Sequence, residues 1–435
     1  MARRGYVQCN NRCRMRRKLA GFPVTTVISA ALVLGALAAT ACGSGGDGAP
    51  ASGATPPGSG DPATAGSNGN GNGNGGGGGV LMPAGGASLD CGGHGCGVKA
   101  VALGTIAACA LLEDGTVACY GGGIVGTLGR ADRPMIDPVP TRVPGLANVA
   151  KIFGGGYTMC AVLVDQSVTC WGPDQSENPY GARPSDRFVV EGLTGVVELS
   201  VATSHTCALV AGGDVYCFGS NYFGELGDGT TSNAKKAVKV ASITGAKQVA
   251  TGAEVTCAVL ANGAVSCWGM NDMGQLGQGT TDQLVHSDPT AVLGLDAPVT
   301  SIDASSEAGV VCALLENGTT RCWGEKLGDS AGAATPGATS LSVGWKHACV
   351  MDGAGAVSCF GSNTKGQLGN ASMAPAPAAV AASGIRGAIG FAVGGNSSCA
   401  VFGDGSFSCW GDDTRGQLGG GQIAPNRSAP AKQHF

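Results

Sequence analysis

Charged residues, histidines and long apolar runs are all scarce in this chain of 435 residues. Asp, Glu, Lys and Arg make up 13% of the sequence, well below the usual share of about a quarter, and only five histidines are present. Apart from one run near the amino end, no segment offers the roughly 20 apolar residues of a membrane-spanning helix. No close Cys-x-x-Cys pair of the zinc-binding kind occurs. We therefore predict no metal site, no cofactor, no histidine-based catalysis and no membrane span in the body of the protein.

Glycine and cysteine are abundant, with 78 and 19 copies, and the cysteines are regularly spaced. Seven times, two cysteines stand ten positions apart, and an aromatic residue and a glycine follow the second one. The gaps between successive first cysteines are 51, 47, 50, 55, 37 and 50 residues, which is typical of propeller blades or solenoid units. The pairs are Cys109/Cys119, Cys160/Cys170, Cys207/Cys217, Cys257/Cys267, Cys312/Cys322, Cys349/Cys359 and Cys399/Cys409.

Each cysteine pair is expected to lie on a β-hairpin. The segment CAVLANGAVSCWG, from Cys257 to Gly269, has two short apolar stretches around an Asn-Gly turn. Six of the seven units have a glycine six residues after the first cysteine, where a positive φ is expected, and Gln166 is the exception. The turn places the two cysteines opposite each other, so we predict a disulfide in each unit. Both faces of the hairpin are largely apolar, which favours small sheets packed around an axis.

The amino end resembles a bacterial lipoprotein signal. Seven Arg or Lys residues fall within residues 3–18, an apolar run extends from about Val24 to Ala38, and Ala39-Thr40-Ala41 precede Cys42. We expect residues 1–41 to be removed, after translation from Met1 or Met15, and Cys42 to be lipidated. Residues 42–90 are rich in Gly, Ser, Ala, Pro and Asn, and are predicted to form a flexible linker to a folded domain at residues 91–435. The alternative is a transmembrane helix, for which the run is short.

The cysteine count agrees with export. When Cys9, Cys13 and Cys42 are set aside, 16 cysteines remain, which are the seven pairs together with Cys91 and Cys96. An even remainder fits an oxidising compartment, and Cys91 and Cys96 are expected to form a small disulfide loop. Without the signal, 19 basic residues stand against 30 acidic ones, a net charge of −11. Nucleic acid is therefore not expected as a partner.

The repeats resemble those of the regulator of chromosome condensation, in a cysteine-paired bacterial secreted form. The resemblance rests on units such as CAVLANGAVSCWGMNDMGQLGQGTT (Cys257–Thr281) and on Gly-x-Leu-Gly motifs around five leucines: Leu128, Leu226, Leu276, Leu368 and Leu418. Unit five keeps only Leu327-Gly328, and unit two lacks the motif. The resemblance implies an all-β protein with a seven-bladed propeller. We expect the carboxyl-terminal tail to complete the ring beside Val98–Leu103.

The resemblance does not imply a single activity. One member of the family exchanges guanine nucleotide on a small GTPase, and others bind proteins. We predict a non-enzymatic, monomeric scaffold, adhesion-like or inhibitor-like. It would bind an extracytoplasmic protein at the cell envelope, facing the periplasm or the exterior, with the lipid on Cys42 as its only membrane contact. Nucleotide exchange is one alternative, and glycan binding or processing is another.

Candidate contact residues come from the irregular unit two. Its segment Pro173–Arg187 replaces the Gly-x-Leu-Gly motif and includes Tyr180, Arg183 and Arg187, which could contact a partner; decay of a dispensable repeat is the alternative. Trp345 is the only tryptophan outside the cysteine-aromatic-glycine step, and we expect it in the core; exposed, it would be an anchor for a partner. His205 and His347 share one repeat position, which indicates a structural role.

Overall fold

The computed structural model describes residues 89, 96–132, 134–176, 184–327 and 332–435, with the side chains of residues 184–186 left aside. The chain divides into two compact units, residues 1–80 and 81–435, and every described residue belongs to the second. Within the described residues, no helix is of a length and apolarity that would let it cross a membrane. The proposed signal and Cys42 lie outside them.

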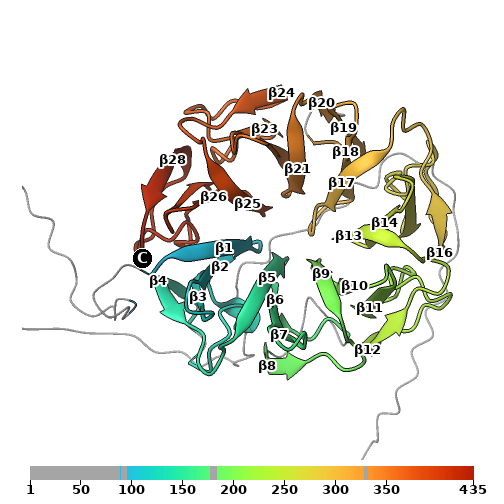
Figure 1. Cartoon of the computed structure of the whole chain (residues 1–435), viewed down its shortest axis with the longest axis horizontal. Helices are drawn as coiled ribbons and strands as arrows, with labels where there is room; N and C mark the ends of the chain where they lie inside the picture. Colours follow the sequence, from blue (N-terminus) through green and yellow to red (C-terminus); the bar gives the residue numbers. More distant parts are fainter. Residues whose placement is uncertain (1–88, 90–95, 133, 177–183, 328–331) are drawn as a thin grey trace, which may run out of the picture. The chain divides into compact units, whose positions relative to one another are not determined.

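The second unit is a seven-bladed β-propeller, as the repeat count predicts (Figure 1). Each blade is an antiparallel four-stranded sheet, with its strands in sequence order. The first strand of each blade lies next to the axis and the fourth lies on the rim (Figure 1). The one helical turn among the described residues is η1 (Ile124–Gly126).

The strands β1 to β14 form the first three blades and the first two strands of the fourth blade. Their strands are β1 (Val98–Leu103), β2 (Ala107–Leu112), β3 (Val117–Gly122), β4 (Ile136–Arg142), β5 (Val149–Gly155), β6 (Thr158–Leu163), β7 (Val168–Pro173), β8 (Pro184–Val189), β9 (Val196–Val201), β10 (His205–Val210), β11 (Val215–Gly219), β12 (Ala234–Lys239), β13 (Ala246–Gly252) and β14 (Val255–Leu260).

The remaining strands complete the fourth to seventh blades. They are β15 (Val265–Gly269), β16 (His286–Ala291), β17 (Val299–Ala304), β18 (Val310–Leu315), β19 (Thr319–Gly324), β20 (Gly332–Ala334), β21 (Ala338–Val343), β22 (His347–Asp352), β23 (Val357–Gly361), β24 (Ala376–Ala381), β25 (Ala388–Gly394), β26 (Ser397–Phe402), β27 (Phe407–Gly411) and β28 (Arg427–Gln433).

Every blade has a disulfide between its second and third strands, as the ten-residue spacing predicts. In the fourth blade, Cys257 stands directly opposite Cys267, with Cα atoms 4.1 Å apart. The same direct pairing recurs around the ring, so each bridge fastens the middle of its own sheet. The seven bridges join Cys109 to Cys119, Cys160 to Cys170, Cys207 to Cys217, Cys257 to Cys267, Cys312 to Cys322, Cys349 to Cys359 and Cys399 to Cys409.

Only one cysteine of the eighth expected disulfide lies within the described residues. Cys96 is disulfide-bonded, and Cys91, its expected partner, lies outside the described residues. The pairing of Cys91 with Cys96 therefore stays a prediction.

The hairpin turns between the bridged strands form as expected. The glycine midway has a positive φ in six blades, and Gln166 adopts φ 68° in the second. The exception in the sequence is thus an exception in residue type alone, because the backbone conformation is kept.

Where the Gly-x-Leu-Gly motif is present, it joins its blade to the next one. Leu226 of the third blade is fully buried in one cluster with Trp268 of the fourth, and the indole Nε1 of Trp268 donates to the carbonyl oxygen of Glu225 at 2.9 Å. The last glycine of the motif lies on the indole, since a Cβ on Gly227 would stand 2.5 Å from Nε1. The motif is therefore an inter-blade seal. The same bond links Trp171 to Thr127, Trp323 to Gln275 and Trp410 to Gln367.

The ring closes between the seventh and first blades. The tail forms β28, the outer strand of the seventh sheet, rather than a strand of the first sheet. The last residue reaches the first blade: the backbone N–H of Cys96 donates to the carbonyl oxygen of Phe435 at 3.2 Å, and the Phe435 ring packs edge-on against Tyr120 at 5.7 Å between centroids. The tail therefore lies beside the first blade, as expected, and contributes packing there.

Candidate functional site

The antiparallel sheets give the propeller two different ends. The turns between first and second strands and the loops between third and fourth strands emerge at one end, which we call the loop face. The hairpin turns that follow the second strands lie at the other end. The loop face has the longer and more variable segments, so it is where side chains are freest to serve binding.

The first turn of the fifth blade, residues 305–309, crosses the loop face, and we call it the crossing turn. Residues 305–309 separate β17 from β18, whereas two or three residues separate the corresponding strands of the other blades. The Thr105 hydroxyl of the first blade donates to Oε1 of Glu307 at 2.6 Å, and the Thr203 hydroxyl of the third blade donates to the Ser306 carbonyl at 2.7 Å. Because the first and fifth blades are not neighbours, this turn lies across the end of the channel.

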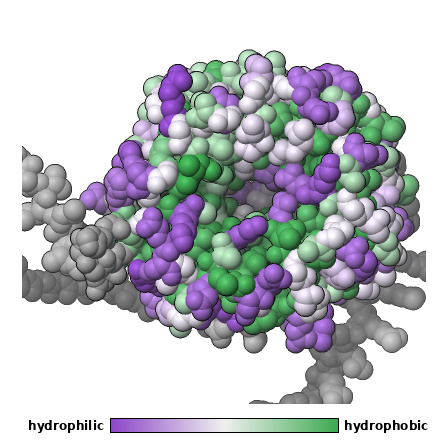
Figure 2. Space-filling model, viewed as in Figure 1, coloured by the Kyte–Doolittle hydropathy of each residue, from purple (hydrophilic) through white to green (hydrophobic). Residues whose placement is uncertain are grey.

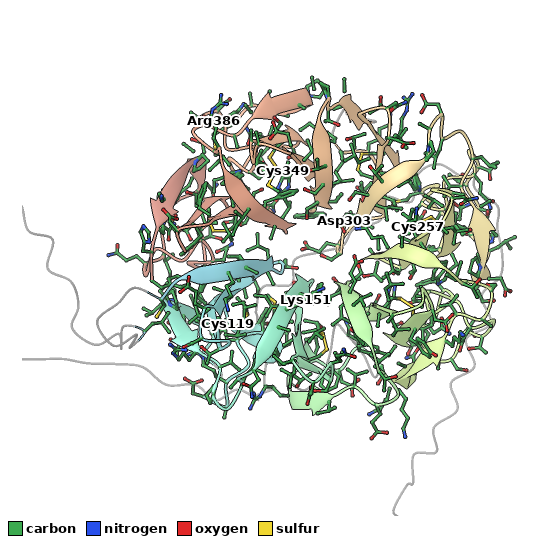
Figure 3. All side chains as sticks on the ribbon, in the orientation of Figure 1. Cys119, Lys151, Cys257, Asp303, Cys349 and Arg386 are labelled. Atoms are coloured by element: carbon green, nitrogen blue, oxygen red, sulfur yellow. A yellow bond between two sulfur atoms is a disulfide. The ribbon has the colours of Figure 1, made fainter. Side chains whose placement is uncertain are left out.

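The central channel behind this turn is a cavity of about 190 Å³ that receives residues from all seven inner strands. The molecule is hollowed near its centre in the space-filling view (Figure 2). Asp303, at the end of β17, points into the channel (Figure 3). Its carboxylate accepts N–H bonds from Val343 at 2.8 Å and from Ala304 at 2.9 Å. Burial raises the pKa of Asp303 to about 6, although these bonds and one from Ser342 oppose the shift.

A second buried acid is Glu198 on β9 of the third blade, which lines a pocket with Lys247 and Gln248 of the fourth blade. Burial raises the pKa of Glu198 to about 7, a hydrogen bond with Gln248 and the Lys151 ammonium lower it, and the Asp303 charge raises it further. The Gln248 side chain also accepts the backbone N–H of Ile302 at 2.9 Å. Asp303 and Glu198 therefore take part in contacts that link the third to sixth blades.

His205 and His347, which share one repeat position in the third and sixth blades, have structural roles, as predicted. His205 and His347 are fully buried, and burial lowers the pKa of each to about 3. The Nε2 atoms lie 2.7 Å from the Thr256 hydroxyl and 3.0 Å from the Ser398 hydroxyl, in the next blade in each case. Within the part of the chain that the structure describes, no three His, Cys, Asp or Glu side chains gather as metal ligands would.

Trp345 lies on the loop face and is 42% exposed, so the expectation of a core position is wrong. The reason is its place in the three-residue turn between β21 and β22, beside the crossing turn: its carbonyl accepts the Ser305 hydroxyl at 3.4 Å. Met273 borders the other end of that turn, with its sulfur 3.7 Å from where a Gly309 Cβ would stand. Met273 and Tyr222 are 39% and 60% exposed. These three large side chains give the loop face apolar contact area.

Acids accompany these apolar residues. Glu254, in the first turn of the fourth blade, has φ 60°, which is rare for a residue with a side chain. Burial raises its pKa to about 7, and the charges of Glu225 and Asp272 raise it further. Burial likewise raises the pKa of Glu307 on the crossing turn. The loop face therefore combines exposed apolar side chains with partly desolvated carboxyl groups.

The contact residues predicted for unit two are only partly described. Tyr180 and Arg183 lie outside the described residues. Arg187 is exposed on β8, and its guanidinium lies 3.3 Å from where a Cβ on Gly145, in the connection that leaves the first blade, would stand. Their role in binding stays a prediction. Sequence reasoning missed the crossing turn, although the longest gap between first cysteines, 55 residues, falls at the fifth blade.

Comparison with known proteins identifies the repeats. Two family models described as the regulator of chromosome condensation (RCC1) repeat match residues 196–225, 246–275 and 338–367, and residues 212–259 and 262–312. Residues 196–312 and 338–367 of the propeller therefore match RCC1 repeats. These matches fall on blades three, four and six and on part of blade five.

Several known proteins are similar to this chain over limited stretches of sequence. Human E3 ubiquitin-protein ligase HERC2 is 32% identical over 142 residues, which are 30% of this chain and 3% of HERC2. Protein pim1 of Schizosaccharomyces pombe is 32% identical over 109 residues, 21% of this chain and 20% of pim1. The crystal structure of human WBSCR16 has a TM-score of 0.60 at 18% identity, with 68% of this chain and 85% of that chain covered. This chain thus matches a small part of its curated relatives, and the structural likeness concerns the fold. RCC1-repeat propellers commonly serve as protein-binding scaffolds, mostly in binding or regulation.

Proposed function

We propose that this RCC1-repeat propeller is an exported, lipid-anchored scaffold that binds a protein at the cell envelope through its loop face. The observation that carries the proposal is the arrangement around the crossing turn, where Trp345 and Met273 border a turn that Glu307 and Thr105 hold across the channel. A covered channel leaves a broad surface instead of an open cleft. Exposed aromatic and methionine side chains are typical centres of protein interfaces.

The disulfides support a location outside the cytosol. Seven bridges within blades are typical of an oxidising compartment, and a GTPase exchange factor would work in a reducing one. The sequence before the propeller supports the same location, since it has the pattern of a signal ending at Cys42 and a linker on the order of 40 Å in root-mean-square span. Such a tether suits a binding head held above a membrane.

The export half of the proposal is tested by the mass of the protein from its native cells. We expect protein that is alkylated without reduction to have the mass of a chain that begins at diacylated Cys42, with none of its other 16 cysteines alkylated. Reduction in denaturant before alkylation is the control, and it should make all of them react. A chain that begins at Met1 or Met15 with free thiols would overturn the export proposal and would favour nucleotide exchange, which the family resemblance also implies.

The binding half is tested on the loop face itself. We expect Trp345→Ala to weaken retention of the native envelope partner about 30-fold, because a buried interface tryptophan typically contributes about 2 kcal/mol or more. The measurement is capture of cross-linked partners from intact envelopes, followed by titration of the partner recovered. Val164→Ala, at an exposed position in the hairpin turn of the second blade at the other end, is the matched control. Equal retention by both variants would exclude the loop face.

A further inference from the structure

A pocket of about 670 Å³ lies at the end of the propeller that carries the hairpin turns, which we call the hairpin end. Its walls come from blades three to six and include the turns of blades four and five. The connections here depart from the repeat, because residues 292–298 and 335–337 join blades where six residues are usual. Every wall residue and its neighbours along the chain are described. The regular repeat therefore does not produce this pocket.

Two opposite charges line the pocket without an ion-pair partner among the described residues. Lys247 is exposed on the inner strand β13, and Glu316 is exposed in the hairpin turn of the fifth blade. The matching lysine of the first blade is Lys99, whose ammonium group donates to the Glu113 carbonyl at 2.7 Å. Lys247 has no such bond within the described part of the chain. A ligand with one anionic and one cationic group would pair with both side chains.

The inner wall of the pocket has a buried hydroxyl group without a partner. Ser301, on β17, is 7% exposed, and its Oγ makes no hydrogen bond within the residues that the structure describes. Buried hydroxyl groups are nearly always hydrogen-bonded, so Ser301 is available to a bound ligand. The polar residues from the inner strands of blades three and four, Glu198 and Gln248, are hydrogen-bonded to each other. Glu198 is therefore already engaged.

The neutral polar groups at the rim offer both donors and acceptors. The Oδ1 of Asn262 accepts the Ala264 N–H at 3.0 Å, so its Nδ2 group remains a donor. The hydroxyl groups of Thr300 and Thr339 each donate to a backbone carbonyl of their own blade at 3.1 Å, so their lone pairs remain acceptors. A peptide backbone matches this mixture, since each residue has one N–H and one C=O. The apolar walls are the small side chains of Val259, Ala261, Pro298 and Val299.

We propose that this pocket binds a short peptide with free termini, whose carboxylate pairs with Lys247 and whose ammonium group pairs with Glu316. Small side chains such as that of alanine suit the apolar walls. The volume is in the range of small-molecule sites, about 300–1,000 Å³. The pocket lies at the end opposite the loop face, so this inference goes beyond the proposed function and does not depend on it.

The probes are peptides of two, three and four alanines, titrated into the full chain and followed by NMR of the peptide methyl groups. We expect at least one peptide with free termini to bind with a Kd on the order of 1 mM or tighter. The same peptide with an acetylated amino end and an amidated carboxyl end should bind about tenfold more weakly, because it loses both charges. No binding at any length, or equal binding of the free and capped peptides, would overturn the inference.

Substitutions assign the two contacts. Lys247→Gln should weaken binding of the free peptide about fivefold and leave binding of the amidated peptide, which has no carboxylate, unchanged. Glu316→Gln should weaken the free peptide similarly and leave the acetylated peptide, which has no ammonium group, unchanged. Both residues are exposed, so the variants should fold. The matched controls are Lys99→Gln and Glu113→Gln, at the same two positions of the first blade. Equal binding by the pocket variants and these controls would overturn the inference.

Discussion

Replacing Cys257 and Cys267 together by alanine is expected to lower the free energy of unfolding by about 2–5 kcal/mol. The bridge joins the two middle strands of the fourth blade, and both cysteines are fully buried between neighbouring blades. In the chain-entropy account, closing a ten-residue separation contributes about 3 kcal/mol by restricting the unfolded chain. The two alanines also leave space in a packed core, which adds to the loss. Denaturant titration of oxidised wild type and the double variant measures the difference.

The blade-five bridge provides the matched comparison. Cys322 is part-exposed, whereas Cys312 and both cysteines of the fourth blade are fully buried. Removing Cys312 and Cys322 together should therefore lower the free energy of unfolding by a smaller amount, because less buried contact is lost. Under a non-denaturing reductant, this bridge should also open first, since exchange requires access of a thiolate to a sulfur atom. Equal losses for the two pairs, with no order of reduction, would mean that burial does not govern how much each bridge contributes.

The regular features of the fold are visible in the sequence because each one repeats. A ten-residue cysteine spacing with a glycine six residues in determines strand, turn, strand and the cross-strand pair at once, and Gly263 adopts φ 79° as that pattern requires. The identity of the aromatic residue also contains information that a search for motifs overlooks. The blades after four of the five complete Gly-x-Leu-Gly units have a tryptophan, the blades after the two defective units have Phe218 and Phe360, and the first blade, which follows the seventh unit around the ring, has Tyr120. The physical reason is the indole N–H, which needs the carbonyl of that motif.

The features that set the loop face could not be obtained from the repeat. The burial of Trp345 depends on the turn of another blade that lies beside it. In this protein that neighbour is the crossing turn of the fifth blade. Contacts such as Thr105 with Glu307 join residues 202 positions apart, across the axis. No periodic pattern specifies such a contact. The candidate binding surface is therefore a property of the assembled ring, whereas the blades are a property of local sequence.

Between about pH 4 and 8, the stability of wild type relative to Asp303→Asn is expected to fall by about 3 kcal/mol. Burial in the channel raises the pKa of Asp303 to about 6, against about 3.9 in an unfolded chain. The folded protein then holds this proton more tightly than the unfolded chain does. Wild type therefore loses stability as pH rises from about 4 to 6, and each unit of pKa difference is worth about 1.4 kcal/mol. Asparagine exchanges no proton in this range, so its stability lacks this dependence.

The change with pH, rather than the value at one pH, reports the titration of Asp303 together with its coupling to Glu198, whose pKa the Asp303 charge raises. Asparagine loses the bond from the Val343 N–H at every pH, which shifts the difference by a constant. His205 and His347, whose pKa values burial lowers, destabilise both proteins equally in acid. Asp404→Asn gives a control of opposite sign, because Lys432 and Ser406 hold the pKa of Asp404 below its usual value. Its difference from wild type should grow as pH rises towards about 4, where this carboxyl ionises in the unfolded chain, and should then stay nearly level to pH 8. A difference for Asp303→Asn that stays constant from pH 4 to 8 would show that the channel does not hold this carboxyl protonated.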